Sequence, residues 1–116
     1  MDPSPFVMAM DLVKIVVFTP LDTADQVRQA LADAGAGHIG NYDSCSFSSR
    51  GIGRFRPLEG ANPHIGQQGQ LEEVEEERIE VVCPRADLEE IIQKLREAHP
   101  YEEPAIDVYQ LIDVRL

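Results

Sequence analysis

The stretch RIEVVCPRADLEEIIQKL, residues 78–95, decides the fold because it holds two kinds of periodicity separated by a proline. Its first part is rich in β-branched residues, and Pro84 has no backbone N–H for a sheet, so a strand should end there. Asp87 and Glu90 have the spacing at which side chains satisfy the unpaired amides of a helix start. The apolar residues that follow share one helical stripe: Leu88, Ile91, Ile92 and Leu95. The sequence therefore predicts a strand followed by an amphipathic helix that ends before Pro100.

The same order of elements occurs once earlier in the chain. Residues 12–19, LVKIVVFT, are β-branched, aromatic and nearly all apolar, as in a strand covered by other elements. Thr23 and Gln26 repeat the capping spacing, and Gly35 can adopt the left-handed conformation that ends a helix. The apolar residues between them also form one stripe: Ala24, Val27, Ala30, Leu31 and Ala34. A second strand–helix unit is predicted here.

A long β-hairpin is predicted between the two units. Residues 42–55 are polar and serine-rich, and Gly51 and Gly53 are typical of a bulged or bent strand. Residues 57–69 are crowded with glycine, proline and asparagine, which favours neither a helix nor a strand. The return strand is predicted over residues 71–83, which contain six glutamates between Glu72 and Glu80 and the apolar residues Val74, Ile79, Val81 and Val82.

A last strand is predicted over residues 105–114, where apolar and polar residues alternate. The order strand, helix, strand, strand, helix, strand, with right-handed crossovers, gives an α+β, ferredoxin-like βαββαβ fold: a four-stranded antiparallel sheet with two helices on one face. We expect one domain over residues 11–116, preceded by a disordered leader over residues 1–10. Because the sheet should be apolar on both faces, we expect oligomerisation to cover the face without helices.

Composition narrows the possible partners. The 116 residues include 21 acidic and 10 basic side chains, giving a formal net charge of −11. This charge argues against nucleic acid and anionic membranes as partners, since both need a positive surface. The apolar run at residues 12–18 is far shorter than the roughly 20 residues that span a bilayer. No charged segment precedes this run and no small-residue cleavage site follows it, so we expect a cytoplasmic protein.

Two motifs carry a resemblance to a known family. They are GIGRFRPLEGANPHIGQQGQLEEVEEERIE, residues 51–80, and AHPYEEPAIDV, residues 98–108. Both closely resemble the small domain inserted in many bacterial NGG1-interacting-factor-three-like (YqfO-type) proteins, which also occurs as a free-standing short protein. The resemblance implies a fold similar to CutA and PII signalling proteins, which are ferredoxin-like and trimeric. It implies a chain without the flanking domains that hold the dinuclear metal site of full-length relatives, so their enzymatic label should not be carried over.

The loop over residues 60–69 is the first candidate site. Its glycines and Pro63 permit left-handed geometry and close backbone approach, so Asn62 and Gly66 are candidate contacts to an anion or a nucleotide. The same residues also suffice to shape the tip of a long hairpin. The loop lacks the Lys-Ser/Thr ending of a phosphate-binding Walker loop.

Three arginines form the second candidate site. Arg50, Arg54 and Arg56 share one face of a strand, where they would make a cationic patch that grips a phosphate or a carboxylate. Alternatively, they pair across the hairpin with the glutamates of residues 72–80. The second arrangement needs no ligand.

The turn HPYEEP after the second helix is the third candidate site. His99 and Glu102, with the sequence-distant His64, are ligand types for a divalent metal such as Zn²⁺ or Mn²⁺. Alternatively, His99 lies favourably at the negative end of the helix, and Glu102 bonds to backbone or to an arginine. Because this turn belongs to a family-like motif, it is also a candidate for a subunit-interface or ligand role, in which we predict that Glu102 faces Arg54 or Arg78.

Two cysteines are present, one on each strand of the predicted hairpin. With the hairpin midpoint near His64, Cys45 and Cys83 would lie roughly opposite each other, close enough for a redox-sensitive disulfide. The alternative is two reduced thiols in a cytosolic protein. Neither cysteine has a neighbouring histidine or lysine in sequence, so nucleophilic catalysis has no support.

Three functions remain open at this stage. The first is a non-enzymatic, homotrimeric CutA/PII-like binding or regulatory module for a small anion, a divalent metal or a partner protein. Its candidate ligand-binding residues are Arg54, Arg56, Asn62, Gly66, Arg78 and Glu102. The second is a metal-dependent hydrolase in which His99, Glu102 and His64 hold the metal that activates water. The third is a purely structural oligomerisation domain.

Overall fold

The computed structural model describes residues 11–112 and residue 114, so the predicted leader over residues 1–10 lies outside the described residues. The strands are β1 (Leu12–Pro20), β2 (Phe47–Phe55), β3 (Glu72–Pro84) and β4 (Ile106–Gln110). The helices are α2 (Ala24–Asp33) and α3 (Leu88–Ala98), each preceded by a short 3₁₀ turn, Leu21–Thr23 and Arg85–Asp87 respectively. This is the predicted βαββαβ order.

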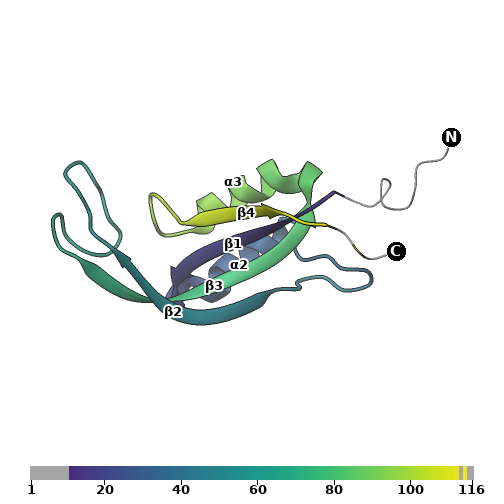
Figure 1. Ribbon diagram of the computed structural model, residues 1–116, viewed down its shortest axis with the longest axis horizontal. Coiled ribbons are helices and arrows are strands. Elements are labelled where there is room, and N and C mark those ends of the chain that lie inside the picture. Colours follow the sequence, from purple (N-terminus) through teal and green to yellow (C-terminus); the bar gives the residue numbers. More distant parts are fainter. Residues whose placement is uncertain (1–10, 113, 115–116) are drawn as a thin grey trace.

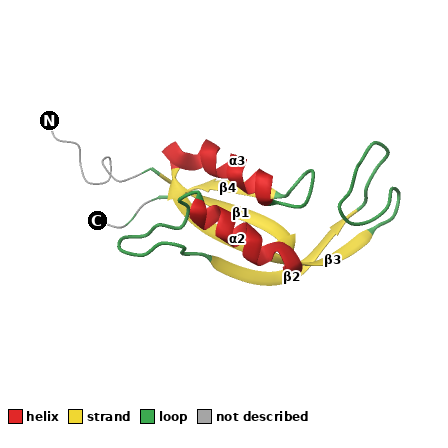
Figure 2. Ribbon diagram, turned by 180° about the vertical axis from the view of Figure 1, so that it is seen from behind, coloured by secondary structure: helices red, strands yellow, loops and turns green. Residues whose placement is uncertain are grey.

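The four strands form one sheet in the order β2-β3-β1-β4, and each neighbouring pair is antiparallel. Figure 1 shows the sheet from its free face, and Figure 2 shows both helices lying across the other face. The ferredoxin-like α+β fold predicted from the sequence is therefore confirmed.

The core lies between the sheet and the two helices. The odd-numbered residues of β1 face it, and Ile15 and Val17 are fully buried. β3 contributes alternate residues beginning with Ile79. The helices add the stripes that their periodicity predicts: Ala24, Val27 and Leu31 from α2, and Ile91 and Leu95 from α3. Burying these side chains contributes about 1.5–3 kcal/mol each, which makes this layer the main source of stability.

The predicted capping of the two helices is wrong. Neither Thr23 nor Asp87 makes a side-chain hydrogen bond to its helix. The Thr23 hydroxyl instead bonds to the Thr19 hydroxyl, 2.7 Å away, and to the Pro20 carbonyl. In both helices the preceding 3₁₀ turn supplies a backbone acceptor for the first helical amide instead. The Ala24 N–H donates to the Leu21 carbonyl, and the Leu88 N–H donates to the Arg85 carbonyl. The helix end at Gly35 is confirmed, with φ of 98°.

Two strand predictions also need correction. β2 begins at Phe47 rather than at residue 42, and its pairing with β3 is unbroken from Phe47 opposite Glu80 to Phe55 opposite Glu72. The glycines of β2 therefore mark no bulge. β4 ends at Gln110, earlier than predicted, and the side chain of Ile112 beyond it is exposed.

The face of the sheet without helices is mixed rather than apolar, which corrects the sequence-based expectation. By register it carries Lys14, Phe18, Arg78 and Glu80 near its centre. Lys14 Nζ lies 3.2 Å from Glu80, and the Arg78 guanidinium lies 5.8 Å from the centre of the Phe18 ring. These charged side chains cover apolar neighbours such as Val16, which is fully buried.

Among the described residues, neither helix has the length and apolar character that crossing a membrane requires.

Candidate functional site

The hairpin of β2 and β3 extends beyond the rest of the sheet. β1 ends at Pro20, which lies opposite Glu76, whereas β2 and β3 continue to pair as far as Phe55 and Glu72. Figure 1 shows this two-stranded extension bending beyond the end of β1 and ending in a long loop. The extension has helices on neither face, so its side chains are free to form a site.

The loop between β2 and β3 folds back on itself. The Gly69 N–H donates to the Pro57 carbonyl at 2.7 Å, which closes the loop at its base. Gly66 has φ of 94°, and a Cβ at that position would lie 2.6 Å from Cγ of Glu72. Gly66 is therefore required by the path of the loop, as the hairpin-tip interpretation predicts.

The turn after α3 is fixed to β1 by His99. The His99 ring bonds through Nε2 to the Phe18 carbonyl at 2.7 Å, and Nδ1 accepts the Tyr101 N–H at 3.1 Å. Because Nδ1 is an acceptor, Nε2 carries the proton and the ring is neutral. Burial lowers the pKa of His99, with the Phe18 carbonyl acting in the opposite direction and nearby His64 lowering the pKa further.

One hydrogen bond joins this turn to the hairpin loop. The Asn62 N–H donates to Glu102 Oε1 at 2.9 Å. Beside it, the rings of Phe55 and Tyr101 meet edge to face with their centres 5.8 Å apart. Segments that are about 40 residues apart in sequence therefore form one structural unit, and both family-like motifs contribute to it.

A cavity of about 740 Å³ lies between the loop and the turn. Four of the predicted site residues line it: Arg54, Arg56, His64 and Glu102. Phe18, Phe55 and Tyr101 add aromatic walls. This volume falls in the range of roughly 300–1,000 Å³ that is typical of small-molecule sites.

Glu76 also lines the cavity, although no sequence pattern indicated it as a site residue. Glu76 is 8% exposed, and Tyr101 donates its hydroxyl proton to Glu76 Oε2 at 3.2 Å. Burial raises the pKa of Glu76, only partly offset by the Tyr101 hydrogen bond. Burial, together with the nearby Glu76 carboxylate, raises the pKa of Tyr101 well above its ordinary value.

Gly53 makes the buried position of Glu76 possible. A Cβ at Gly53 would lie 2.5 Å from Cδ of Glu76, and closer still to Oε1. The carboxyl group therefore occupies the space that any other residue at this position would fill. A glycine inside a strand is the signal that indicates such a close approach.

The three arginines differ in their partners, although the register places Arg50 and Arg54 on the same face of β2, as predicted. Arg54 pairs with Glu73, directly opposite on β3, with Nε 3.1 Å from the carboxylate, as the pairing interpretation predicts. Arg50 is opposite Glu77, but Glu77 accepts from Arg28 of α2 at 2.6 Å. Hydrogen bonds to Asp25 and Glu77 raise the pKa of Arg28.

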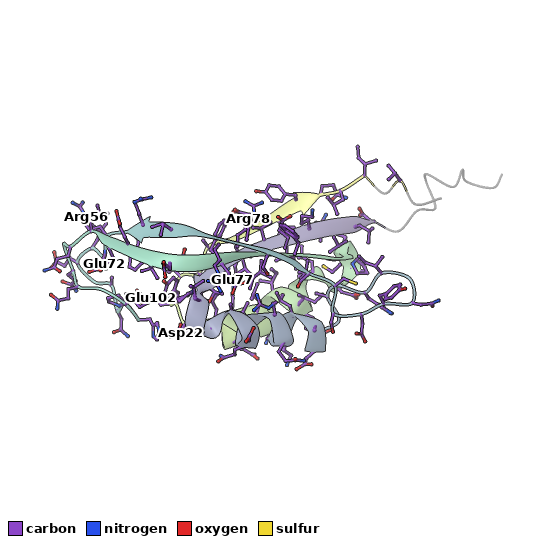
Figure 3. The ribbon with its side chains drawn as sticks, turned by 90° about the horizontal axis from the view of Figure 1, so that it is seen from below. Asp22, Arg56, Glu72, Glu77, Arg78 and Glu102 are labelled. Carbon is purple, nitrogen blue, oxygen red and sulfur yellow. The ribbon has the colours of Figure 1, made fainter. Side chains whose placement is uncertain are left out.

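The predicted partner of Glu102 is wrong. Glu102 accepts from the Asn62 backbone, while Arg54 and Arg78 pair with Glu73 and Glu80 respectively. Figure 3 shows the reason for Arg78: it lies over the middle of the sheet, whereas Glu102 and Arg56 lie at the hairpin end. Arg78 therefore belongs to the free face and not to the cavity.

The proposed metal ligands do not converge. Both ring nitrogens of His99 are engaged in hydrogen bonds, so this ring offers no free lone pair to a metal. His64 is near the turn, with its ring centre 6.3 Å from that of Tyr101. Within residues 11–112 and 114, no three His, Cys, Asp or Glu side chains form a group that could hold a metal ion.

The cysteines are not placed as predicted. Cys45 precedes β2 and is partly buried, whereas Cys83 is buried within β3, opposite Val13 of β1. Both are free thiols in this structure. Burial, followed by the charge of Asp87, raises the pKa of Cys83, which makes it a poor nucleophile.

Comparison with known proteins adds an independent view. No family model matches the chain. The chain is 53% identical over 100 residues to a GTP cyclohydrolase 1 type 2 homolog of Halalkalibacterium halodurans, covering 86% of this chain and 27% of the relative. A Bacillus cereus protein related to NIF3 matches at a TM-score of 0.78 with 51% identity, covering 90% of this chain and 26% of that one. The chain thus spans about a quarter of the length of these relatives.

A third match covers a whole small protein. CutA from Xylella fastidiosa superposes with a TM-score of 0.66 over 91% of this chain and 88% of its own, at 20% identity. The fold is CutA-like. At this level of identity the likeness concerns the fold alone, so the CutA-like architecture is established without any conclusion about a ligand.

Proposed function

We propose that this chain is the CutA-like domain of the NGG1-interacting-factor-three-like family and acts as a non-enzymatic binding module. The sequence similarity to segments of two much longer relatives supports the family assignment. The activity of those whole proteins is not carried over, because the similarity covers about a quarter of each.

The observation that carries the binding role is the cavity between the hairpin loop and the turn after α3. Its walls come from two distant segments that the bond between Asn62 and Glu102 holds together. It combines aromatic walls with charged side chains of both signs, a composition typical of a ligand site. A small anion, a divalent metal and a partner protein are the ligand classes to test.

We also propose that the module works as a cytoplasmic homotrimer. Among the described strands, β2 and β4 are the edges of the sheet and have no strand partner on their outer side, which favours pairing with another copy. Phe47 on β2 and Tyr109 on β4 are large and exposed on the free face of the sheet. Burial of both features between subunits would explain why a small acidic protein retains them.

Thermal unfolding in the presence of phosphate, nucleotides and Mn²⁺ or Zn²⁺ tests the binding role. A ligand that binds the folded state raises the melting temperature with concentration. A matched pair of variants localises the effect: His64→Ala changes a cavity wall, whereas His38→Ala changes an exposed residue outside the cavity. Binding at the cavity predicts a reduced shift for His64→Ala alone, and equal shifts for both variants would contradict it.

Light scattering tests the assembly. A homotrimer has three times the chain mass of 12.9 kDa. A monomer at micromolar concentration would contradict the trimer and leave the cavity as a site within a single chain. Stability that no ligand class changes, combined with a stable trimer, would support a purely structural domain instead.

A further inference from the structure

Glu76 lacks the partner that a buried carboxylate normally has. Its cross-strand neighbours are Pro20 on β1 and Gly51 on β2, and neither has a side chain that donates a hydrogen bond. Tyr101 bonds to Oε2 only. Among the described residues, no lysine, arginine or histidine forms an ion pair with Glu76. Oε1 therefore retains its capacity to accept a hydrogen bond.

Other carboxylates of β3 show what Glu76 is missing. Glu77 pairs with Arg28, and Glu80 pairs with both Lys14 and Arg78. Glu80, on the same face of the sheet as Glu76, has its pKa lowered by these cations, Lys14 first. A buried carboxylate without such a partner is costly, and it either takes up a proton or binds a cation from outside.

The cavity around Glu76 suits an organic cation. The rings of Phe55 and Tyr101 line it, and aromatic faces attract ammonium groups within about 6 Å. Four carboxylates line the cavity, Glu59, Glu76, Glu102 and Glu103, against the two guanidinium groups of Arg54 and Arg56. Arg54 is already paired with Glu73. The lining is thus negative, which disfavours a small anion.

A divalent metal fits this position less well. Metal sites in proteins need three or more converging oxygen, nitrogen or sulfur ligands. Among the described residues, the hydrogen-bond partner of Glu76 is the Tyr101 phenol, and phenols are neutral at physiological pH. The described His, Cys, Asp and Glu side chains form no group that could hold a metal ion. A primary ammonium ion needs fewer protein partners, because one of its three N–H groups can bond to a carboxylate oxygen while the others face aromatic rings or solvent.

We propose that the cavity binds a small primary amine as its ammonium ion, with Glu76 Oε1 accepting a hydrogen bond from the ammonium group and the rings of Phe55 and Tyr101 beside its alkyl chain. The proposal rests on the proposed function, since it assigns the ligand chemistry of that same cavity. Binding involves no covalent step.

Calorimetric titration with n-butylammonium chloride tests the proposal directly, with n-butanol and sodium butyrate as neutral and anionic counterparts of the same length. Only the ammonium should bind. Glu76→Gln keeps the size of the side chain and removes its charge, so it should weaken binding roughly tenfold or more. Glu75→Gln is the matched control, because Glu75 is the exposed neighbour of Glu76 on β3 and lies outside the cavity lining, and it should leave affinity within about twofold.

The other possible results would overturn either the amine assignment or the proposed function. Equal binding of butanol or butyrate, or full affinity in Glu76→Gln, would overturn the amine assignment and leave the cavity as a binding site for another ligand. Failure of every probe, including phosphate and Mn²⁺, would overturn the proposed function itself. If butylammonium bound only while dissociating the oligomer, a basic side chain of a second copy would occupy the cavity, and the small-molecule proposal would be wrong.

Discussion

Two regions of this molecule bury different kinds of side chain. One is the helix-covered layer, which is the core between the sheet and helices α2 and α3. The other is the hairpin end, which consists of the β2–β3 extension, its loop and the turn after α3. In the layer, β1 contributes fully buried apolar side chains such as Ile15 and Val17 to a core closed by α2 and α3. The hairpin end buries two ionisable side chains, Glu76 and His99. Both ring nitrogens of His99 are hydrogen-bonded within the chain, whereas Glu76 receives a hydrogen bond from Tyr101 on one carboxylate oxygen, Oε2.

This difference in buried side chains indicates that a binding function is expected at the hairpin end. A buried apolar side chain gains free energy wherever it packs, so the core needs no ligand. A buried carboxylate such as Glu76 loses hydration, and Tyr101 compensates only in part. The comparison predicts that core substitutions change stability and that hairpin-end substitutions change binding.

The largest effect is expected in the core. Ile15→Ala should lower the free energy of unfolding by about 2–5 kcal/mol, because it removes buried apolar volume and leaves a cavity. Val108→Ala is the matched control, since Val108 lies directly opposite Ile15 on the same face but is 41% exposed. Urea unfolding measures both. Equal losses for the two variants would show that the layer is not the main source of stability.

A smaller effect is expected for Gly53→Ala. Its Cβ would displace the buried Glu76 carboxyl group from its position beside Tyr101, at a cost of about 1–3 kcal/mol. Gly51→Ala is the control, because Gly51 lies on the same strand and face with nothing within 4 Å of its Cβ. Calorimetric melting should show a loss for Gly53→Ala alone. A neutral Gly53→Ala would contradict the buried position of Glu76.

A pH-dependent effect is expected from His99. Its folded-state pKa is lowered, so below the ordinary value of 6.5 the unfolded chain binds more protons and stability falls as the pH falls. Glu76 acts in the opposite sense: its raised pKa makes stability fall as the pH rises above about 4.5. Urea unfolding of the wild type and of His99→Gln, measured between pH 8 and pH 5, separates the contribution of His99 from that of Glu76.

The His99→Gln protein should be less stable at pH 8 and should lack the loss that the wild type shows on acidification through this range. His38→Gln changes an exposed histidine and should retain the wild-type profile. Parallel profiles for wild type and His99→Gln would mean that His99 does not titrate differently in the folded chain.

The smallest effect is expected from Arg54→Ala. Arg54 and Glu73 are 58% and 63% exposed, and ion pairs between exposed side chains contribute about 0–1 kcal/mol. The free energy of unfolding should therefore change by less than about 1 kcal/mol in urea. A larger loss would show that the hairpin extension depends on this pair as the layer depends on its apolar side chains.

Local periodicity was sufficient to predict the fold. The stripes of Val27 and Leu31, and of Ile91 and Leu95, are buried as their spacing indicates, because an amphipathic helix has one face to cover. The capping of both helices was not predictable, since 3₁₀ turns place Thr23 and Asp87 after the first helical turn rather than before it.

The candidate site was predicted only in outline. Arg54, Arg56, His64 and Glu102 do line one cavity, because the loop and the turn that carry them meet in space. Glu76 was not predicted as a site residue, because it is one of six glutamates between residues 72 and 80. Its burial depends on Tyr101, 25 residues away, and on the missing side chain of Gly53, and no local pattern encodes such a contact.

The pKa of Glu76 is the most direct test of the contrast between the two regions. A ¹³C NMR titration of its side-chain carboxyl should give a value above the ordinary 4.5 in the free protein. Added n-butylammonium should lower that value, because a bound cation favours the charged form. A pKa at or below 4.5 in the free protein, or one that the amine leaves unchanged, would contradict an uncompensated carboxylate that binds a cation.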